Sequence, residues 1–288
     1  MDGFASKGKL NVCSYGGSTM SQAPFRRWFG GGLGAVVLAL AMIVVPARGA
    51  EDEAKKAKVA ELIKQLGDAD ADARMQAAVG LDRIGPEAKE AVPALIKALG
   101  DPEPRVRIAA ADAFLDMGPS AKDAVPALIK TLGDGDVDVR SVAAHTLGEI
   151  GVAAKDAVPA LIKALGDPDV HVRGIAAYAF GQIGPEAKEA VPALINALGS
   201  ESDSVRQCAA IGLGGIGAAG KEAVPALIKV LGDPEGKVRG WAAFALGEMG
   251  PSAKEAIPEL ERLAEKDPDE FVRQFAQEAV GKIRKGND

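Results

Sequence analysis

The sequence predicts an all-α protein, an α-solenoid of about seven helix pairs with a period of 33 residues. Two observations carry this prediction: a heptapeptide motif and an arginine motif each return at that spacing along the chain. The composition agrees, because the 288-residue chain is 48% hydrophobic but only 4% aromatic, so its core must come from small aliphatic side chains that let helices approach closely. In such repeats each unit buries its apolar face against its neighbours.

The heptapeptide Ala-Val-Pro-Ala-Leu-Ile-Lys predicts the first helix of each unit. The apolar residues of one copy stand at i, i+3, i+4 and i+7, on one helix face: Val92, Leu95, Ile96 and Leu99. Pro93 is compatible because it lies in the first turn, where a missing N–H has no intrahelical partner. Copies begin at Ala91, Ala124, Ala157, Ala190 (with Asn196 in place of the lysine) and Ala223, with degenerate copies at 59–64 and from Ala256.

The arginine motif predicts the second helix of each unit. Gly100 ends the first helix, and we expect Asp101 to be the N-cap of the second helix and Pro102 its first residue. The apolar stripe is then Val106, Ala110, Phe114 and Met117, and Gly118-Pro119 ends the helix. The aspartate returns at Asp68, Asp134, Asp167 and Asp233, and the motif arginines are Arg74, Arg107, Arg140, Arg173, Arg206, Arg239 and Arg273.

These paired helices, with their Asp, Val-Arg and Gly-Pro signals, resemble HEAT-type repeats, and the closest subtype is the short, alanine-rich form named after phycobilisome lyases. The resemblance covers residues 58–288 and implies a right-handed superhelix with the first helices on the convex side and the second helices on the concave side. It also implies a ladder in which the seven arginines bond to aspartates of neighbouring repeats. A row of anion-binding arginines is the alternative interpretation.

Function is best sought where the repeats differ. Counted from each arginine, positions +1, +5 and +8 of the second helix point away from its core stripe and toward the concave face. Position +8 is mostly glycine, which predicts close approach of a ligand or of the neighbouring helix. A binding groove and partly buried packing between repeats both remain open. The candidate partner-binding residues are Ser141, His145, Tyr178, Gln207, Ile211, Trp241 and Phe244.

Residues 1–49 have the pattern of an export signal. The pair Arg26-Arg27 precedes an apolar run from Gly30 to Val45, and small residues precede Ala50, where we expect cleavage. Cleavage before Arg48 is an alternative, and Met20 is an alternative start. The arginine pair also resembles a twin-arginine signal, although Phe25 stands where that motif usually has Ser or Thr. The sequence therefore predicts a periplasmic or secreted protein; an inner-membrane anchor through residues 29–45 is the alternative.

The mature chain divides into a charged linker at 50–57 and the solenoid at 58–288. Beyond residue 49 the net charge is −10, which argues against nucleic acid as a partner. The repeats contain no metal-ligand spacing, nucleophile elbow or nucleotide-binding motif, so we expect no metal, no cofactor and no catalysis. The pattern favours a monomeric, non-catalytic scaffold of the cell envelope that binds a protein or peptide. Binding of a small apolar ligand, or an activity like that of the phycobilin lyases, is the alternative.

Overall fold

The computed structural model describes residues 37–285, with side chains from residue 51 onward, and all its regular elements are helical. The chain divides into two units, Met1–Ala50 and Glu51–Asp288, and the repeats belong to the second. The α-helices are α1 (Val37–Gln65), α2 (Ala71–Ile84), α3 (Val92–Ala98), α4 (Pro104–Asp112), α5 (Val125–Thr131), α6 (Val137–Ile150), α7 (Val158–Ala164), α8 (Val170–Ile183), α9 (Val191–Ala197), α10 (Asp203–Ile216), α11 (Val224–Val230), α12 (Gly236–Glu248), α13 (Ile257–Lys266) and α14 (Glu270–Lys285). Six 3₁₀ segments precede the odd-numbered helices from α3 onward: η1 (Gly85–Ala91), η2 (Gly118–Ala124), η3 (Gly151–Ala157), η4 (Gly184–Ala190), η5 (Gly217–Ala223) and η6 (Gly250–Ala256).

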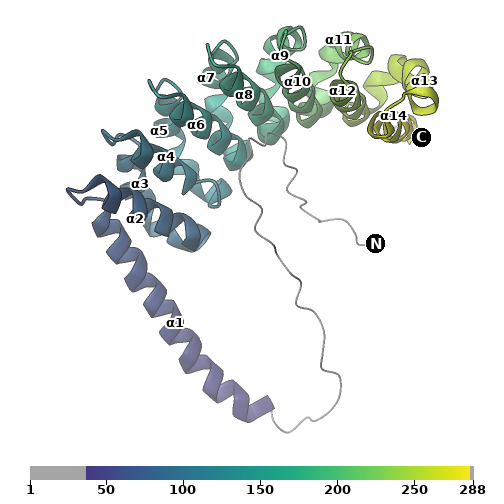
Figure 1. The fold of residues 1–288 in the computed structure, drawn as a ribbon. Coiled ribbons are helices and arrows are strands. Elements are labelled where there is room, and N and C mark those ends of the chain that lie inside the picture. Colours follow the sequence, from purple (N-terminus) through teal and green to yellow (C-terminus); the bar gives the residue numbers. More distant parts are fainter. Residues whose placement is uncertain (1–36, 286–288) are drawn as a thin grey trace. The chain divides into compact units, whose positions relative to one another are not determined.

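The second unit is a curved row of helix pairs. Figure 1 shows the even-numbered helices side by side along the inner edge of the curve and the odd-numbered helices from α3 onward along the outer edge. The even-numbered helices contact one another most extensively, as at α8–α10 and α12–α14. This arrangement confirms the predicted all-α solenoid. We call the surface of the even-numbered helices on the inner edge the inner face.

The core consists of the apolar stripes that the periodicity predicts. Val106, Ala110 and Phe114 are completely buried, and Phe114 and Phe180 are the largest fully buried side chains. Alanine fills much of the remaining core, which lets neighbouring helices lie close together. Gly118, at φ 50°, makes the turn out of its unit in a backbone conformation that other residues rarely adopt, and a glycine with positive φ stands at the same point of five further units.

Two local expectations differ from the structure. Asp101 is not the N-cap of α4, because the helix begins two residues later, at Pro104, after the N-cap Glu103. The carboxylate of Asp101 instead accepts a hydrogen bond from the N–H of Glu103 and two from Arg74 of the preceding unit. Residues 50–57, expected to be a linker, lie inside α1, and the side chains of 51–57 are exposed.

The export signal, its two arginines and the alternative anchor at 29–45 fall outside the residues whose side chains the structure describes. Among the residues that the structure does describe, no helix has both the length and the apolar character that a membrane crossing requires.

Candidate binding surface on the inner face

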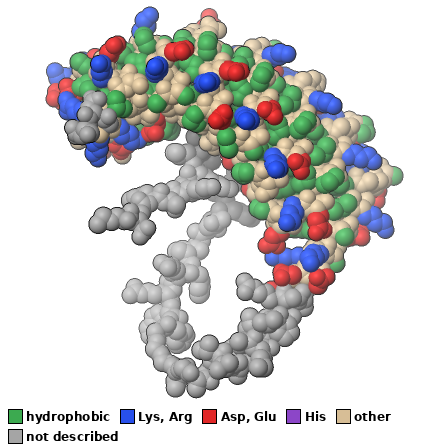
Figure 2. Space-filling view, turned by 180° about the vertical axis from the view of Figure 1, so that it is seen from behind, with side chains coloured by type: hydrophobic (Ala, Val, Ile, Leu, Met, Phe, Trp, Pro, Cys, Tyr) green, Lys and Arg blue, Asp and Glu red, His purple; other side chains and the backbone are tan. Residues whose placement is uncertain are grey.

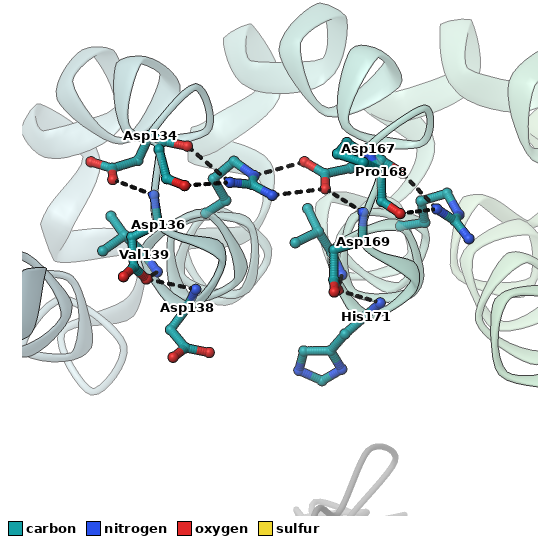
Figure 3. A network of polar contacts seen from close by, with 12 residues as sticks. Asp134, Asp136, Asp138, Val139, Asp167, Pro168, Asp169 and His171 are labelled. Carbon is teal, nitrogen blue, oxygen red and sulfur yellow. Dashed lines mark hydrogen bonds and ion pairs between the residues drawn. The ribbon is translucent and has the colours of Figure 1, made fainter.

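Arginines and aspartates of successive repeats form a ladder along the loops between first and second helices. In the rung at Arg140, Nη1 donates to the carbonyl oxygens of Asp134 and Gly135 in its own loop. Its Nε and Nη2 donate to both carboxylate oxygens of Asp167 in the next unit, at 2.8 and 3.0 Å. Figure 3 shows this contact and the bond from the Asp169 N–H to Asp167. The planar guanidinium thus joins its own loop to an aspartate that lies 27 residues further along the chain.

The same carboxylate–arginine contact occurs in five units, joining Arg74 to Asp101, Arg107 to Asp134, Arg140 to Asp167, Arg206 to Asp233 and Arg239 to Asp267. The rung arginine side chains are 13–14% exposed, so these ion pairs are shielded from water. The bond from Arg140 lowers the pKa of Asp167, and the bond from Arg74 lowers the pKa of Asp101. These contacts are those of the ladder that the resemblance implies.

Arg173 and Arg273 lack this ion pair among the described residues. Arg173 donates from Nη1 to the carbonyl oxygens of Asp167 and Pro168, at 2.6 and 3.0 Å, but the position of the next aspartate is occupied by Ser200. Arg273 belongs to the last unit described and bonds in the same way to its own loop. The ladder is therefore interrupted once within the solenoid.

The candidate binding residues differ in accessibility. Ser141, Ile211 and Trp241 are buried, with exposed fractions of 6%, 9% and 9%. The hydroxyl of Ser141 has no hydrogen-bond partner within the described part of the chain. The half-buried residues are His145, Tyr178, Gln207 and Phe244. Only these four of the seven present substantial surface on the inner face.

Positions +1 and +8 face the next repeat more than the solvent, which accounts for the burial of Ser141 at +1. A Cβ on Gly148, at +8, would lie 3.0 Å from the Cα of Ala179 in the next second helix. A Cβ on Gly174, at +1, would lie 3.7 Å from the sulfur of Cys208. These glycines accommodate the neighbouring helix, one of the two alternatives the sequence left open. At position +5, by contrast, His145, Tyr178 and Phe244 retain exposed side-chain surface, while Ile211 is buried.

Aromatic side chains gather at the α12–α14 end of the inner face. Trp241 lies 5.4 Å from Phe244 and 5.5 Å from Phe275 between ring centroids, and Phe271 lies 4.6 Å from Phe275. The ammonium of Lys282 sits 5.6 Å from the centre of the Phe244 ring. We call these four rings the aromatic cluster. Phe271 was not among the residues predicted from the repeat pattern. It contacts Trp241 across 30 residues at a place where Gly240 leaves room for its ring.

Carboxylates gather at the α2–α4 end. Burial, with a second contribution from the charge of Asp82, raises the pKa of Asp112 to about 6. Burial also raises the pKa of Asp82, with a second contribution from Asp116. We call these three residues the acidic cluster. Among the side chains described, no group of His, Cys, Asp and Glu is arranged to hold a metal ion.

The middle of the inner face carries His145 and Tyr178. Burial lowers the pKa of His145, although the carboxylate of Glu149, 3.7 Å from its Nε2, opposes this effect. His145 is therefore mostly neutral at pH 7.

The face of the molecule drawn in Figure 2 has a more uniform surface than the inner face. Basic and acidic side chains alternate on it, with apolar side chains between them. Such interspersed charge is typical of a solvated surface.

A family model described as HEAT repeats matches four overlapping stretches, residues 59–135, 109–180, 125–204 and 191–281. The chain is a HEAT-repeat protein. A comparison with curated proteins found no match. Among solved structures, an engineered protein is 28% identical with a TM-score of 0.61, covering 78% of this chain and 68% of that one.

Two further solved structures are similar to this chain. The archaeal HEAT-like repeats protein from Thermococcus onnurineus NA1 is 14% identical with a TM-score of 0.56, covering 79% of this chain and 97% of that one. The complex of CpcE and CpcF of phycocyanin lyase from Nostoc sp. PCC7120 is 28% identical with a TM-score of 0.49, covering 77% and 93%. HEAT repeats of this kind typically form scaffolds for interaction.

Proposed function

We propose that this HEAT-repeat protein is a non-catalytic scaffold of the cell envelope whose inner face binds an extended segment of a partner protein. One observation carries the proposal: the inner face changes chemistry from one end to the other on a frame that repeats almost unchanged. Its α2–α4 end has the acidic cluster, and its α12–α14 end has the aromatic cluster with Lys282. Half-buried aromatic rings are the side chains that most often anchor protein partners.

The charge at the two ends favours a particular partner segment. The charge of Asp82 raises the pKa of Asp112, and the charge of Asp116 raises the pKa of Asp82; a basic side chain of a partner would relieve this repulsion. The aromatic cluster would hold an apolar side chain of the same segment. We therefore expect a partner segment with a basic residue at one end and an apolar residue at the other.

Capture of partners from the cell-envelope fraction tests this proposal. The full chain with a C-terminal tag is compared with Tyr178→Ala/Phe244→Ala and with Asp116→Lys, which changes an exposed residue and leaves the core intact. Asp123→Lys, at an exposed position of η2, is the matched control. We expect one protein to be captured by the wild type and by the control and lost in both inner-face variants. Equal capture by all four proteins would refute the inner face as the site.

Export rests on the sequence pattern of residues 1–49 and needs its own test. We expect mass spectrometry of the protein from the periplasmic or secreted fraction to find a chain that begins at Ala50. A chain that retains residues 29–45 and sediments with the inner membrane would instead support the anchor, and a full-length chain in the cytoplasm would refute export.

A further inference from the structure

The interruption of the ladder at Arg173 leaves a guanidinium without the carboxylate that its counterparts bind. In the rungs at Arg74, Arg140, Arg206 and Arg239, Nε and Nη2 both donate to one aspartate, at 2.7–3.0 Å. Ser200 preserves only one function of that aspartate, because its Oγ accepts the N–H of Ser202, at 3.3 Å, as Asp167 accepts the N–H of Asp169. The carboxylate that would meet Nε and Nη2 of Arg173 is missing from the described chain.

A cavity of about 410 Å³ lies at this point, between α7 and α9. Its polar lining comes from Arg173, Ser200 and the side chain of Asn196, which replaces the lysine of the other units. Its apolar lining comes from Ile162, Leu165, Ala193, Ala197 and Val205. The lining contains one cationic side chain and no carboxylate. The two residues responsible, Asn196 and Ser200, belong to the same repeat.

The solenoid contains a matched cavity for comparison. The cavity beside Arg74, of about 550 Å³, has largely the equivalent lining, displaced by 99 residues, with Asp101 in place of Ser200 and Lys97 in place of Asn196. Asp68 and Pro102 also line it, and it lacks a counterpart of Val205. There the guanidinium is already bound to Asp101. The two cavities share the aliphatic positions of Ile162, Leu165, Ala193 and Ala197, and they differ in whether Nε and Nη2 of the arginine already bind a carboxylate.

We propose that the cavity at Arg173 binds a carboxylate with a short aliphatic body, supplied either by a free acid or by the C-terminus of a peptide. The carboxylate would take the place that Asp167 has beside Arg140, with its two oxygens accepting from Nε and Nη2. The aliphatic body would lie against Ile162, Leu165 and Val205. This site lies along the loops between first and second helices, which we call the loop edge of the solenoid. Its occupancy does not depend on the inner face.

Side-chain NMR of the full chain tests the proposal, because the Nε–Hε signal of each arginine reports its own bonds. The probes are hexanoate, hexanamide as its uncharged counterpart, and the peptide acetyl-Ala-Ala-Leu with either a free or an amidated C-terminus. We expect the two carboxylates to shift the Arg173 signal saturably, the amides to leave it unchanged, and the Arg74 signal to stay in place. A response to hexanoate alone identifies a free acid as the source, and a response to the peptide acid alone identifies a peptide C-terminus.

Ser200→Asp is the decisive variant, because it rebuilds the rung from within the chain. We expect it to weaken carboxylate binding about tenfold or more without lowering the melting temperature, while Ser200→Ala retains binding. The proposal fails if neither carboxylate shifts the Arg173 signal, if the amides shift it equally, or if Ser200→Asp binds as the wild type does.

Discussion

The loop edge and the inner face of the same solenoid differ in whether their residues repeat from one unit to the next. Along the loop edge, five units repeat one ion pair with nearly identical geometry. Along the inner face, position +5 carries an aspartate in one unit, a histidine and a tyrosine in the next two, and a phenylalanine near the end: Asp112, His145, Tyr178 and Phe244. The loop edge joins each repeat to the next, whereas the inner face gives each repeat its own chemistry. Substitutions at these two regions should therefore affect different properties.

The largest effect on stability is expected where two second helices touch through their backbones. A Cβ on Gly215 would overlap the backbone of Gly181 in α8, which cannot move without separating α8 from α10. Gly215→Ala should lower the free energy of unfolding by about 3 kcal/mol. Gly135→Ala is the control, because a Cβ there meets no atom within 4 Å. Equal melting temperatures for the two variants would contradict this packing.

Breaking one rung of the ladder should cost less. Asp167→Asn keeps the shape of the side chain but removes the charge that Arg140 binds, and we expect a loss of about 2 kcal/mol at pH 7. Because Arg140 lowers the pKa of Asp167, the rung stabilises the fold above the unfolded pKa of about 3.9 and is lost as pH falls through the lower, folded pKa. The melting difference between variant and wild type should thus shrink below about pH 4. A difference independent of pH would contradict the role of the ion pair.

On the inner face, removing a charge should increase stability. The pKa of Asp112 is raised to about 6 by burial and by Asp82, so its ionisation opposes folding as pH rises from about 4 through 6. Asp112→Asn should stabilise the chain by about 1 kcal/mol at pH 8, after allowance for screening by water, and have no effect near pH 3.5. Thermal melting at both pH values checks this, and a variant less stable at pH 8 would show that Asp112 is a structural acceptor.

The smallest effect is expected at the interrupted rung. Ser200→Asp supplies the missing carboxylate to Arg173 and should raise the free energy of unfolding by about 0.5–1 kcal/mol. Denaturant unfolding of the variant beside the wild type measures this gain. No gain would mean that the Arg173 guanidinium is already satisfied by the carbonyl groups of Asp167 and Pro168.

The sequence predicted the helices and their core more accurately than the surface of the inner face. The period of 33 residues located the core stripe, because residues such as Val139, Ala143 and Leu147 need only helical geometry to fall on one side. It misplaced the N-cap at Asp101, because that carboxylate is bound by Arg74 of another repeat. Ser141 was expected on the concave face but is buried, since position +1 faces the next helix.

The two clusters on the inner face also needed the fold. Asp82 lies in α2, Asp112 is the last residue of α4 and Asp116 follows it, so the effect of Asp82 on the pKa of Asp112 depends on how α2 packs against α4. Phe271 joins the aromatic cluster only because α14 lies beside α12 and Gly240 has no side chain to exclude its ring. No pattern within one repeat could show these contacts.

Photo-crosslinking tests most directly the claim that the inner face is the partner site. A photoreactive residue replaces Asp116 or Glu278 on the inner face, or Lys97 or Lys130 on the first helices, all of them exposed positions where the fold should be unaffected. We expect the two inner-face positions to crosslink one and the same protein in the cell envelope and the two lysine positions not to crosslink it. Crosslinks from Lys97 or Lys130 alone would contradict this expectation and place the partner on the outer edge.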